Sequence, residues 1–310
     1  MSNEGIKTNS IQAWIKAIRP KTLSGAAVPI LIGTAMALKN GNGSNFQIVA
    51  AILCFIFAFI MQIDANFIND YFDFKHGNDN ETRLGPPRAC AEGWVTLTAM
   101  KSAILFTTFL ACLAGLPLVY YGGWQMIIIG VCCVIFCFLY TTTLSYLGLG
   151  DLLVLIFFGI IPICMTYYVV QPEEKQTITS QVFLLSLACG FVVDTLLIIN
   201  NFRDRDNDLA SKKFTLITRV GAKVGIKLYL FAGIMGIFLL AIAFTLSLST
   251  PLRGLCAIII AGIPYLFLHY RTYKRMRQIW QGKELNIILG ETARNILIFG
   301  ILCSSGLFIL

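Results

Sequence analysis

Four amide and carboxylate side chains that lie close together in the sequence form the first candidate site. They are Asn66, Asn69, Asp70 and Asp73, at positions i, i+3, i+4 and i+7. This spacing predicts that all four lie on one face of a helix. Oxygen ligands of this kind suit Mg²⁺, which takes one or two protein carboxylates and leaves positions for water or a substrate phosphate. The pattern therefore predicts a magnesium site that is open to a phosphate group.

A second cluster repeats this chemistry much later in the chain. Asn201, Asp204 and Asp208 again share one helical face, and the polar segments 69–101 and 200–223 together hold half of the chain's 16 acidic residues. The same segments carry cations that suit a phosphate, namely Lys75, Arg83, Arg88, Arg203, Arg205, Lys212 and Lys213. A solvated helix end would explain either cluster alone, but two matching clusters favour a shared site for metal and phosphate.

The elements that must position these clusters are too apolar for a soluble protein. The 310 residues are 57% hydrophobic and 13% charged, with a mean hydropathy of +0.75, whereas ordinary soluble domains have about 25% charged residues. A membrane-spanning helix needs roughly 17–25 mainly apolar residues. This length predicts nine spans, at 22–38, 47–68, 102–121, 124–141, 151–170, 178–199, 224–248, 252–269 and 290–310. We therefore expect an all-α, polytopic membrane protein, a bundle of about nine helices around a central cavity with cytoplasmic cap loops.

The basic residues predict how this bundle is oriented. With the N-terminus in the cytoplasm, the outer loops hold only Lys39, Lys175 and Arg253 of the 24 Lys and Arg residues. The positive-inside rule then places the two acidic clusters on the cytoplasmic side. The net charge of +8 is best explained by anionic lipid headgroups, and it gives no reason to expect a nucleic-acid partner.

The two clusters also resemble each other as segments. Residues 69–73 read NDYFD and residues 200–204 read NNFRD, and each segment closes an even-numbered predicted span. We interpret this as a faint internal repeat within a single transmembrane domain, 1–310. Its halves would be about 20–145 and 150–310, with their acidic ends facing each other.

The motifs resemble those of the UbiA-type intramembrane prenyltransferases. Segment 66–79 is similar to the first aspartate-rich motif of that superfamily, and segment 200–208 with the following 212–221 is similar to the second. Segments 19–23 and 83–88 look most like the branch that prenylates 1,4-dihydroxy-2-naphthoate in menaquinone biosynthesis. Gly77 stands where the general pattern has a further Asp, and the next acid is Asp79.

The resemblance implies a membrane enzyme that uses Mg²⁺ and a polyprenyl diphosphate donor. It would prenylate 1,4-dihydroxy-2-naphthoate with loss of CO₂ and diphosphate, giving demethylmenaquinol, in the bacterial cytoplasmic (inner) membrane. The expected metal ligands are Asn69, Asp73, Asp79, Asp204 and Asp208. The expected catalytic residues are Asp70, Asp73, Asp204, Asp208 and Tyr140, the last through its aromatic face. The expected substrate-binding residues are Asn66, Arg83, Asn201, Arg203 and Lys212, together with Arg19 and Lys21 for the acceptor carboxylate.

Two other functions remain compatible with the sequence. One is prenylation of another aromatic acceptor, such as 4-hydroxybenzoate. The other is secondary transport, since transporters also show internal repeats and intramembrane polar residues. Transport would need polar groups near the bilayer midplane and on both sides, whereas the predicted clusters share one side. The sequence carries no signal for the oligomeric state.

Overall fold

The computed structural model describes residues 5–41, 46–77, 83–246 and 251–309, without the side chains of residues 21, 251 and 252. Nine helical segments in these ranges are long and apolar enough to cross a membrane, as predicted. The elements are α1 (Ile11–Ile18), α2 (Leu23–Gly41), α3 (Ile48–Lys75), α4 (Leu97–Gly115), α5 (Leu118–Gly122), α6 (Gln125–Leu139), α7 (Gly150–Leu155), α8 (Ile161–Val170), α9 (Ser180–Ala210), α10 (Leu216–Val220), α11 (Ala222–Thr245), α12 (Pro251–Ile279) and α13 (Leu285–Leu307). Short 3₁₀ turns lie at Pro20–Thr22 and Glu173–Lys175, and π-helical turns lie at Tyr140–Leu144 and Ile156–Ile160.

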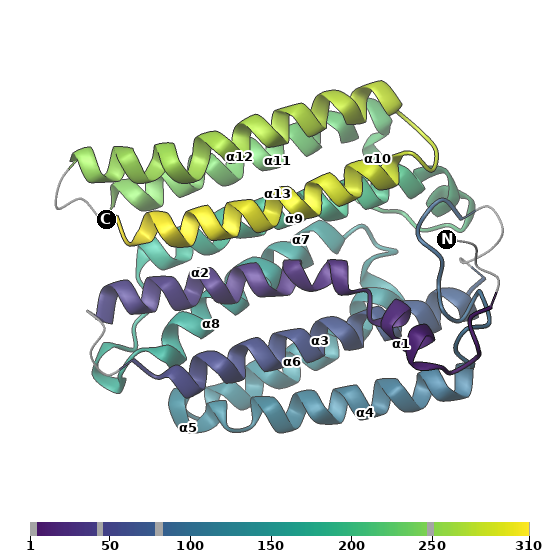
Figure 1. Ribbon diagram of the computed structural model, residues 1–310, viewed down its shortest axis with the longest axis horizontal. Helices are drawn as coiled ribbons and strands as arrows, with labels where there is room; N and C mark the ends of the chain where they lie inside the picture. Colours follow the sequence, from purple (N-terminus) through teal and green to yellow (C-terminus); the bar gives the residue numbers. More distant parts are fainter. Residues whose placement is uncertain (1–4, 42–45, 78–82, 247–250, 310) are drawn as a thin grey trace.

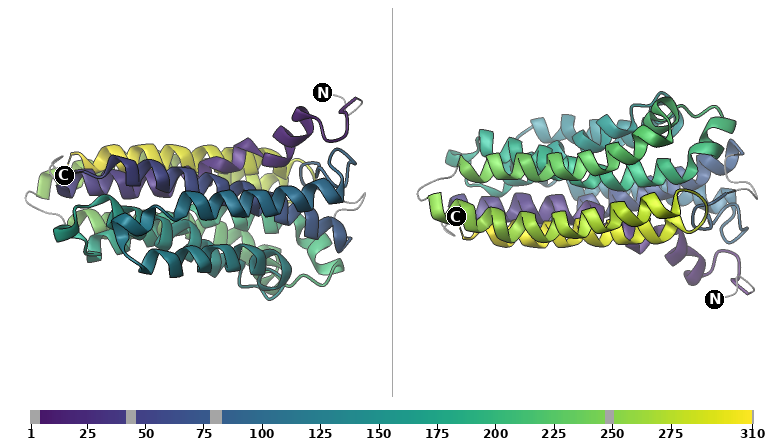
Figure 2. Two further views of the ribbon diagram at one scale, coloured as in Figure 1. Left: turned by 90° about the horizontal axis from the view of Figure 1, so that it is seen from below. Right: turned by 90° about the horizontal axis from the view of Figure 1, so that it is seen from above.

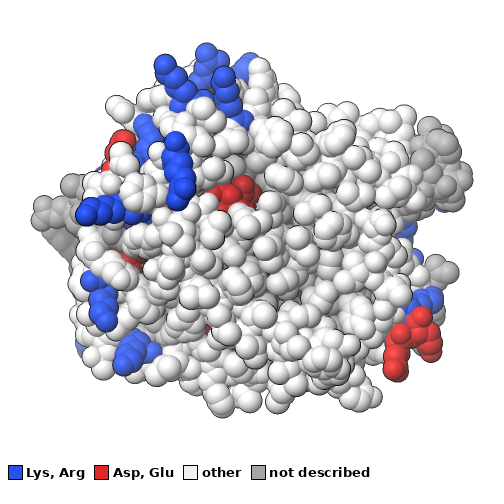
Figure 3. Space-filling view, turned by 180° about the vertical axis from the view of Figure 1, so that it is seen from behind, with Lys and Arg blue, Asp and Glu red and all other residues white. Residues whose placement is uncertain are grey.

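The long helices lie side by side with their axes roughly parallel, as Figures 1 and 2 show. The connections α6–α7, α9–α10 and α12–α13, and the described part of the connection α3–α4, gather at the same end of the bundle (Figure 1). We call this end the polar end, and it also receives the short helix α1. Lys and Arg side chains are concentrated at one end of the face drawn in Figure 3, while the middle of that face is almost free of charge. This distribution fits a helical bundle whose uncharged middle lies in the lipid bilayer.

The acidic clusters lie on two helices that are longer than the hydrocarbon core requires. Helix α3 has 28 residues and α9 has 31. At ~1.5 Å per residue they are roughly 42 and 46 Å long, against a core of ~30 Å. The predicted spans 47–68 and 178–199 therefore continue without a break into both acidic clusters, and the clusters are carried on rigid helix rather than on loops.

Some boundaries differ from the prediction for identifiable reasons. Helix α12 runs ten residues past the predicted end at 269, because its last turns expose charged side chains that need not lie in the membrane. The predicted span 102–121 is instead α4 followed by the short α5, with Pro117 at the junction. Proline has no backbone N–H to continue a helix, so the chain breaks there.

Small residues allow the helix backbones to approach closely at the centre. A Cβ atom built on Gly159 would lie 2.6 Å from the Ser186 carbonyl oxygen and 2.8 Å from Gly190 Cα. The π-helical turn that contains Gly159 thus packs directly against α9. Close approach at small residues is how helices associate in a membrane, where lipid supplies no hydrophobic driving force.

Candidate active site

A cavity of about 970 Å³ lies inside the bundle and reaches the polar end. One face of α3 forms much of its wall. The lining residues of α3 are Cys54, Phe57, Ala58, Met61, Gln62, Ala65, Asn69 and Asp73. They recur every three or four residues, which is the period of a helical face. Apart from Gln62, the stripe is apolar until its last turns, where Asn69 and Asp73 lie.

Helix α9 contributes a second stripe of the same design. Its apolar part is formed by Val193, Leu196 and Leu197. The polar part that follows consists of Asn200, Asn201, Arg203, Asp204, Asn207, Asp208 and the adjacent Ser211. The cavity is therefore apolar towards the bundle centre and rich in amide, carboxylate and guanidinium groups at the polar end. A molecule with a long apolar tail and an anionic head would match this division.

The first cluster divides into two pairs with different surroundings. Asn69 and Asp73 line the cavity. The Thr141 hydroxyl donates to Asn69 Oδ1 at 2.6 Å, and Arg88 Nη2 donates to Asp73 Oδ2 at 2.7 Å. Asn66 and Asp70 are buried away from the lining. The expectation that all four form one column of ligands is thus corrected, because only the edge of this helical face that carries Asn69 and Asp73 turns to the cavity, while the edge that carries Asn66 and Asp70 packs against other segments.

Asn66 and Asp70 hold other segments in place instead. Asn66 Nδ2 donates to the Ile18 carbonyl oxygen at 2.8 Å and to Thr22 Oγ1 at 2.9 Å. These bonds fix the connection between α1 and α2. Asp70 is fully buried, and its two carboxylate oxygens accept the backbone N–H groups of Ala89 and Cys90, each at 2.9 Å. Asp70 thereby ties the segment 83–95, which we call the 83–95 loop, to α3.

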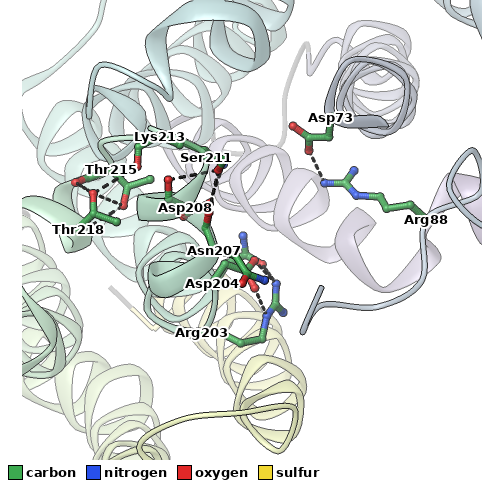
Figure 4. Close-up of polar contacts among 11 residues, drawn as sticks. Asp73, Arg88, Arg203, Asp204, Asn207, Asp208, Ser211, Lys213, Thr215 and Thr218 are labelled. Carbon is green, nitrogen blue, oxygen red and sulfur yellow. Dashed lines mark hydrogen bonds and ion pairs between the residues drawn. The ribbon is translucent and has the colours of Figure 1, made fainter. Parts of the chain in front are cut away.

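The second cluster is organised around a buried arginine. Arg203 is 2% exposed, and its Nε and Nη2 donate to the two carboxylate oxygens of Asp204 at 2.8 and 2.5 Å. Its Nη2 also donates to Asn200 Oδ1 at 2.8 Å, and its Nη1 donates to Asn286 Oδ1 at 2.9 Å. Figure 4 shows the Arg203–Asp204 pair on α9 and the Arg88–Asp73 pair on the opposite side of the site. In each pair an arginine holds a carboxylate that was predicted to bind metal.

The structure brings Lys213 to Asp208, whereas the sequence had indicated Lys212 as the substrate-binding lysine. Lys213 Nζ lies 3.6 Å from Asp208 Oδ1, and Lys213 lines the cavity. Lys212 is exposed and does not line the cavity. The reason is the turn after α9, where Lys212 adopts a left-handed conformation with φ of 57°. This turn directs consecutive side chains to opposite sides, so the position expected for Lys212 is held by Lys213.

The remaining predicted residues fall into two groups. Arg19, Arg83, Tyr140 and Asn201 line the cavity. Arg19 adopts a left-handed conformation with φ of 54°, and its guanidinium lies 3.9 Å from Asp70 Oδ2. Asp79 and the side chain of Lys21 lie outside the described part of the structure.

The donor set of the site fits Mg²⁺. Within the described segments, no three His, Cys, Asp or Glu side chains are grouped closely enough to hold a metal ion. Mg²⁺ does not need such a group, because it binds through one or two carboxylates and completes its shell with water and substrate phosphates. Asp208 Oδ2 is buried and has no hydrogen-bond partner among the described residues. That oxygen, the other cavity carboxylates and the Asn69 amide supply suitable ligands.

Three cavity features were not singled out from the sequence. Asn200 and Asn207 belong to the polar stripe of α9. They continue the three- and four-residue spacing of Val193, Leu196 and Leu197, so this spacing would have predicted that both face the cavity. Asp151, at the start of α7, also lines the cavity, and neither of its carboxylate oxygens has a hydrogen-bond partner in the described part of the chain. The sequence alone shows that this carboxylate stands next to an apolar segment. Only the tertiary structure shows that it has no hydrogen-bond partner among the described residues.

Comparison with known proteins is consistent with this site. The model of the UbiA prenyltransferase family matches residues 26–287. The chain belongs to this family. A relative from Escherichia coli (strain K12), 1,4-dihydroxy-2-naphthoate octaprenyltransferase, is 36% identical over 219 residues, which cover 68% of this chain and 69% of the relative. The enzyme of the same name from Haemophilus influenzae is 28% identical over the full length of both chains.

Solved structures of the family share the fold. A UbiA homologue from Aeropyrum pernix K1 in its apo form superposes with a TM-score of 0.68 at 13% identity, covering 92% of this chain and 97% of that one. A UbiA homologue from Archaeoglobus fulgidus, bound to DMAPP and Mg²⁺, superposes with a TM-score of 0.61 at 13% identity, covering 96% and 99%.

Proposed function

We propose that this protein transfers a polyprenyl group from a polyprenyl diphosphate to 1,4-dihydroxy-2-naphthoate, with loss of CO₂ and diphosphate, to give demethylmenaquinol. The observation that carries the proposal is the 36% identity with the octaprenyltransferase over two thirds of both chains. The cavity supports it independently. It is apolar towards the bundle centre and carries cationic and acidic groups at the polar end, which suits a donor with an apolar tail and a diphosphate head.

The donor's diphosphate would lie between α3 and α9. Arg83 and Lys213 line this end, and Arg88 and Arg203 lie beside the carboxylates of Asp73 and Asp204. Charge builds on the leaving oxygen as the allylic C–O bond breaks, so fixed cations there stabilise the transition state more than the ground state. Mg²⁺ held by Asn69, Asp73, Asp204 and Asp208 would neutralise further charge on the diphosphate.

The apolar stripes of the cavity would protect the allylic cation that forms. Met61 and Phe57 on α3, and Leu196 and Leu197 on α9, leave little for water to bind along this part of the wall. Excluding water prevents simple hydrolysis of the reactive donor. Tyr140 lines the same cavity at the π-helical turn after α6, where its ring could face the cation.

The acceptor would approach from the side of α1 and α2. Arg19 and Lys16 line the cavity there, and Asn66 donates to the Ile18 carbonyl oxygen and the Thr22 hydroxyl on either side of Arg19. A guanidinium in a fixed position suits a bidentate contact with the acceptor carboxylate. We place the polar end, with the N-terminus, on the cytoplasmic side of the bacterial inner membrane, as the distribution of basic residues favours.

The test is prenyl transfer by the purified protein with defined substrates. We expect a prenylated naphthoquinol, identified by mass, and release of CO₂ from carboxyl-labelled 1,4-dihydroxy-2-naphthoate, both abolished by a chelator and restored by Mg²⁺. Asp73→Asn and Asp208→Asn should each reduce the rate by at least ~100-fold, and Asp206→Asn, an exposed acid on the same helix as Asp208, serves as the matched control.

Three results would contradict the proposal in different ways. Product from 4-hydroxybenzoate but not from the naphthoate would assign a different acceptor. Uptake by proteoliposomes without any product would favour transport. Wild-type rates in Asp73→Asn and Asp208→Asn would show that the two acidic clusters do not hold the metal.

A further inference from the structure

One side chain at the start of α13 connects the two halves of the polar end. Asn286 Oδ1 accepts from Arg203 Nη1 at 2.9 Å, and Asn286 Nδ2 donates to the Leu84 carbonyl oxygen at 2.8 Å. The same Nδ2 also donates to the Lys283 carbonyl oxygen at 2.9 Å. A single carboxamide therefore contacts α9, the 83–95 loop and the turn that precedes its own helix.

Arg203 depends on this contact for its position relative to the rest of the bundle. Its other partners, Asn200 and Asp204, lie on α9 itself and cannot orient the guanidinium towards another element. Asn286 comes from α13. The hydrogen bond between them crosses from one helix to another, and its donor Arg203 is buried, so that losing a partner of this charged group is costly.

The 83–95 loop meets Arg203 at the same point. A Cβ atom built on Gly85 would lie 2.8 Å from Arg203 Nη2 and 3.1 Å from Arg83 Nη2. The loop backbone therefore lies against the Arg203 guanidinium, and the guanidinium of Arg83 lies beside it. Both arginines line the cavity. Their relative placement is set where the carboxamide of Asn286 joins Leu84 to Arg203.

We propose that Asn286 is a positioning residue for the donor's diphosphate: it places Arg203 and the 83–95 loop, with Arg83, so that both meet the same anionic group. This inference rests on the proposed function for the identity of the anion. Asn286 does not line the cavity, so its effect passes through Arg203 and the loop. If Asn286 served only to stabilise the α12–α13 turn through its bond to Lys283, its replacement would change stability without changing how the donor binds.

The experiment compares three variants with wild-type protein. Asn286→Ala removes all three contacts, with Arg203, Leu84 and Lys283. Asn286→Asp keeps an acceptor for Arg203 but replaces the group that donates to Leu84 and Lys283 with an oxygen. Asn295→Ala is the matched control, because Asn295 is a buried asparagine on the same helix whose Nδ2 donates to Thr272 Oγ1 at 3.0 Å, away from the cavity.

We expect Asn286→Ala to raise the KM for the prenyl diphosphate by about tenfold or more, because this is the loss expected for one hydrogen bond to a charged group. The KM for the acceptor should change less than about twofold. Asn286→Asp should fall between Asn286→Ala and wild type. Asn295→Ala should lower the thermal midpoint without changing either KM. Binding of a non-transferable prenyl thiolodiphosphate with Mg²⁺, measured by calorimetry, should weaken in the same order.

Two outcomes would overturn the inference. One is unchanged donor KM and thiolodiphosphate affinity in a folded Asn286→Ala protein. The other is an equal rise of the donor and acceptor KM values in Asn286→Ala and Asn295→Ala, which would indicate a general loss of structure. Failure of the proposed function is a separate result, because it appears as absence of prenyl transfer in the wild-type protein whatever Asn286 does.

Discussion

The role of Asp70 gives a sharp test, because sequence and structure assign it differently. The sequence pattern placed Asp70 with the reacting groups. In the structure its carboxylate accepts two backbone N–H groups of the 83–95 loop, from Ala89 and Cys90, at 2.9 Å each. Asp70→Asn keeps one acceptor oxygen and turns an NH₂ group towards the second N–H. At least one hydrogen bond to a charged group is lost, and the charge that faces Arg19 at 3.9 Å is removed as well.

The expected size of the effect follows from this count. A hydrogen bond to a charged group contributes about 1.5–3 kcal/mol. Losing one should make local opening of the loop easier by about 2 kcal/mol, or roughly 30-fold. We therefore expect amide hydrogen exchange at Ala89 and Cys90 to become about 30-fold faster. Prenyl transfer should fall by a similar or smaller factor, because Arg83 and Arg88 are carried on this loop.

The assay is hydrogen–deuterium exchange in detergent, with prenyl transfer measured on the same preparations. Asp64→Asn is the matched control, since Asp64 is a buried acid on the same helix that accepts from the hydroxyls of Thr107 and Thr108 at 2.6 and 2.8 Å. It should leave exchange at Ala89 and Cys90 unchanged. If Asp70→Asn abolishes transfer as fully as Asp73→Asn while both amides stay protected, Asp70 acts on the substrates directly and the reasoning is refuted.

Two further predictions follow from side-chain placement. Lys213→Met should raise the KM for the prenyl diphosphate by about tenfold, as expected for loss of one charged contact. Lys212→Met should leave this KM within about twofold of the wild-type value. A larger effect at Lys212 than at Lys213 would favour the placement expected from the sequence. Gly159→Ala should lower the thermal midpoint in detergent by several degrees, because overpacking costs about 1–3 kcal/mol and its Cβ would meet Gly190 Cα at 2.8 Å. Gly290→Ala is the control, with nothing within 4 Å of its Cβ, and equal midpoints for the two variants would argue against tight packing at Gly159.

Much of the architecture could be predicted from the order of residues. The nine spans follow from the length of apolar segments alone, because a bilayer core sets a minimum helix length. The continuation of α3 and α9 into the acidic segments also has a local cause, since Asn69 and Asp73 keep the helical period of the apolar stripe before them. Boundaries near charged ends, such as that of α12, were less accurate because hydropathy falls there before the helix ends.

The identity of the side chains that enter the cavity was decided by the tertiary structure. Asp70 and Asp73 are both acids at the end of one helix, and only the packing of α3 against the 83–95 loop separates a loop anchor from a cavity residue. Lys212 and Lys213 are adjacent and chemically identical, and a left-handed residue in the turn after α9 determines which one reaches Asp208. Asn286 lies far from both motifs in sequence, so no local pattern connects it with Arg203.

The sequence by itself determined the chemistry and the membrane-spanning framework, because residue type and hydropathy are local properties. The bundle decided which groups meet, because the rotation of each helix and the course of each turn depend on distant neighbours.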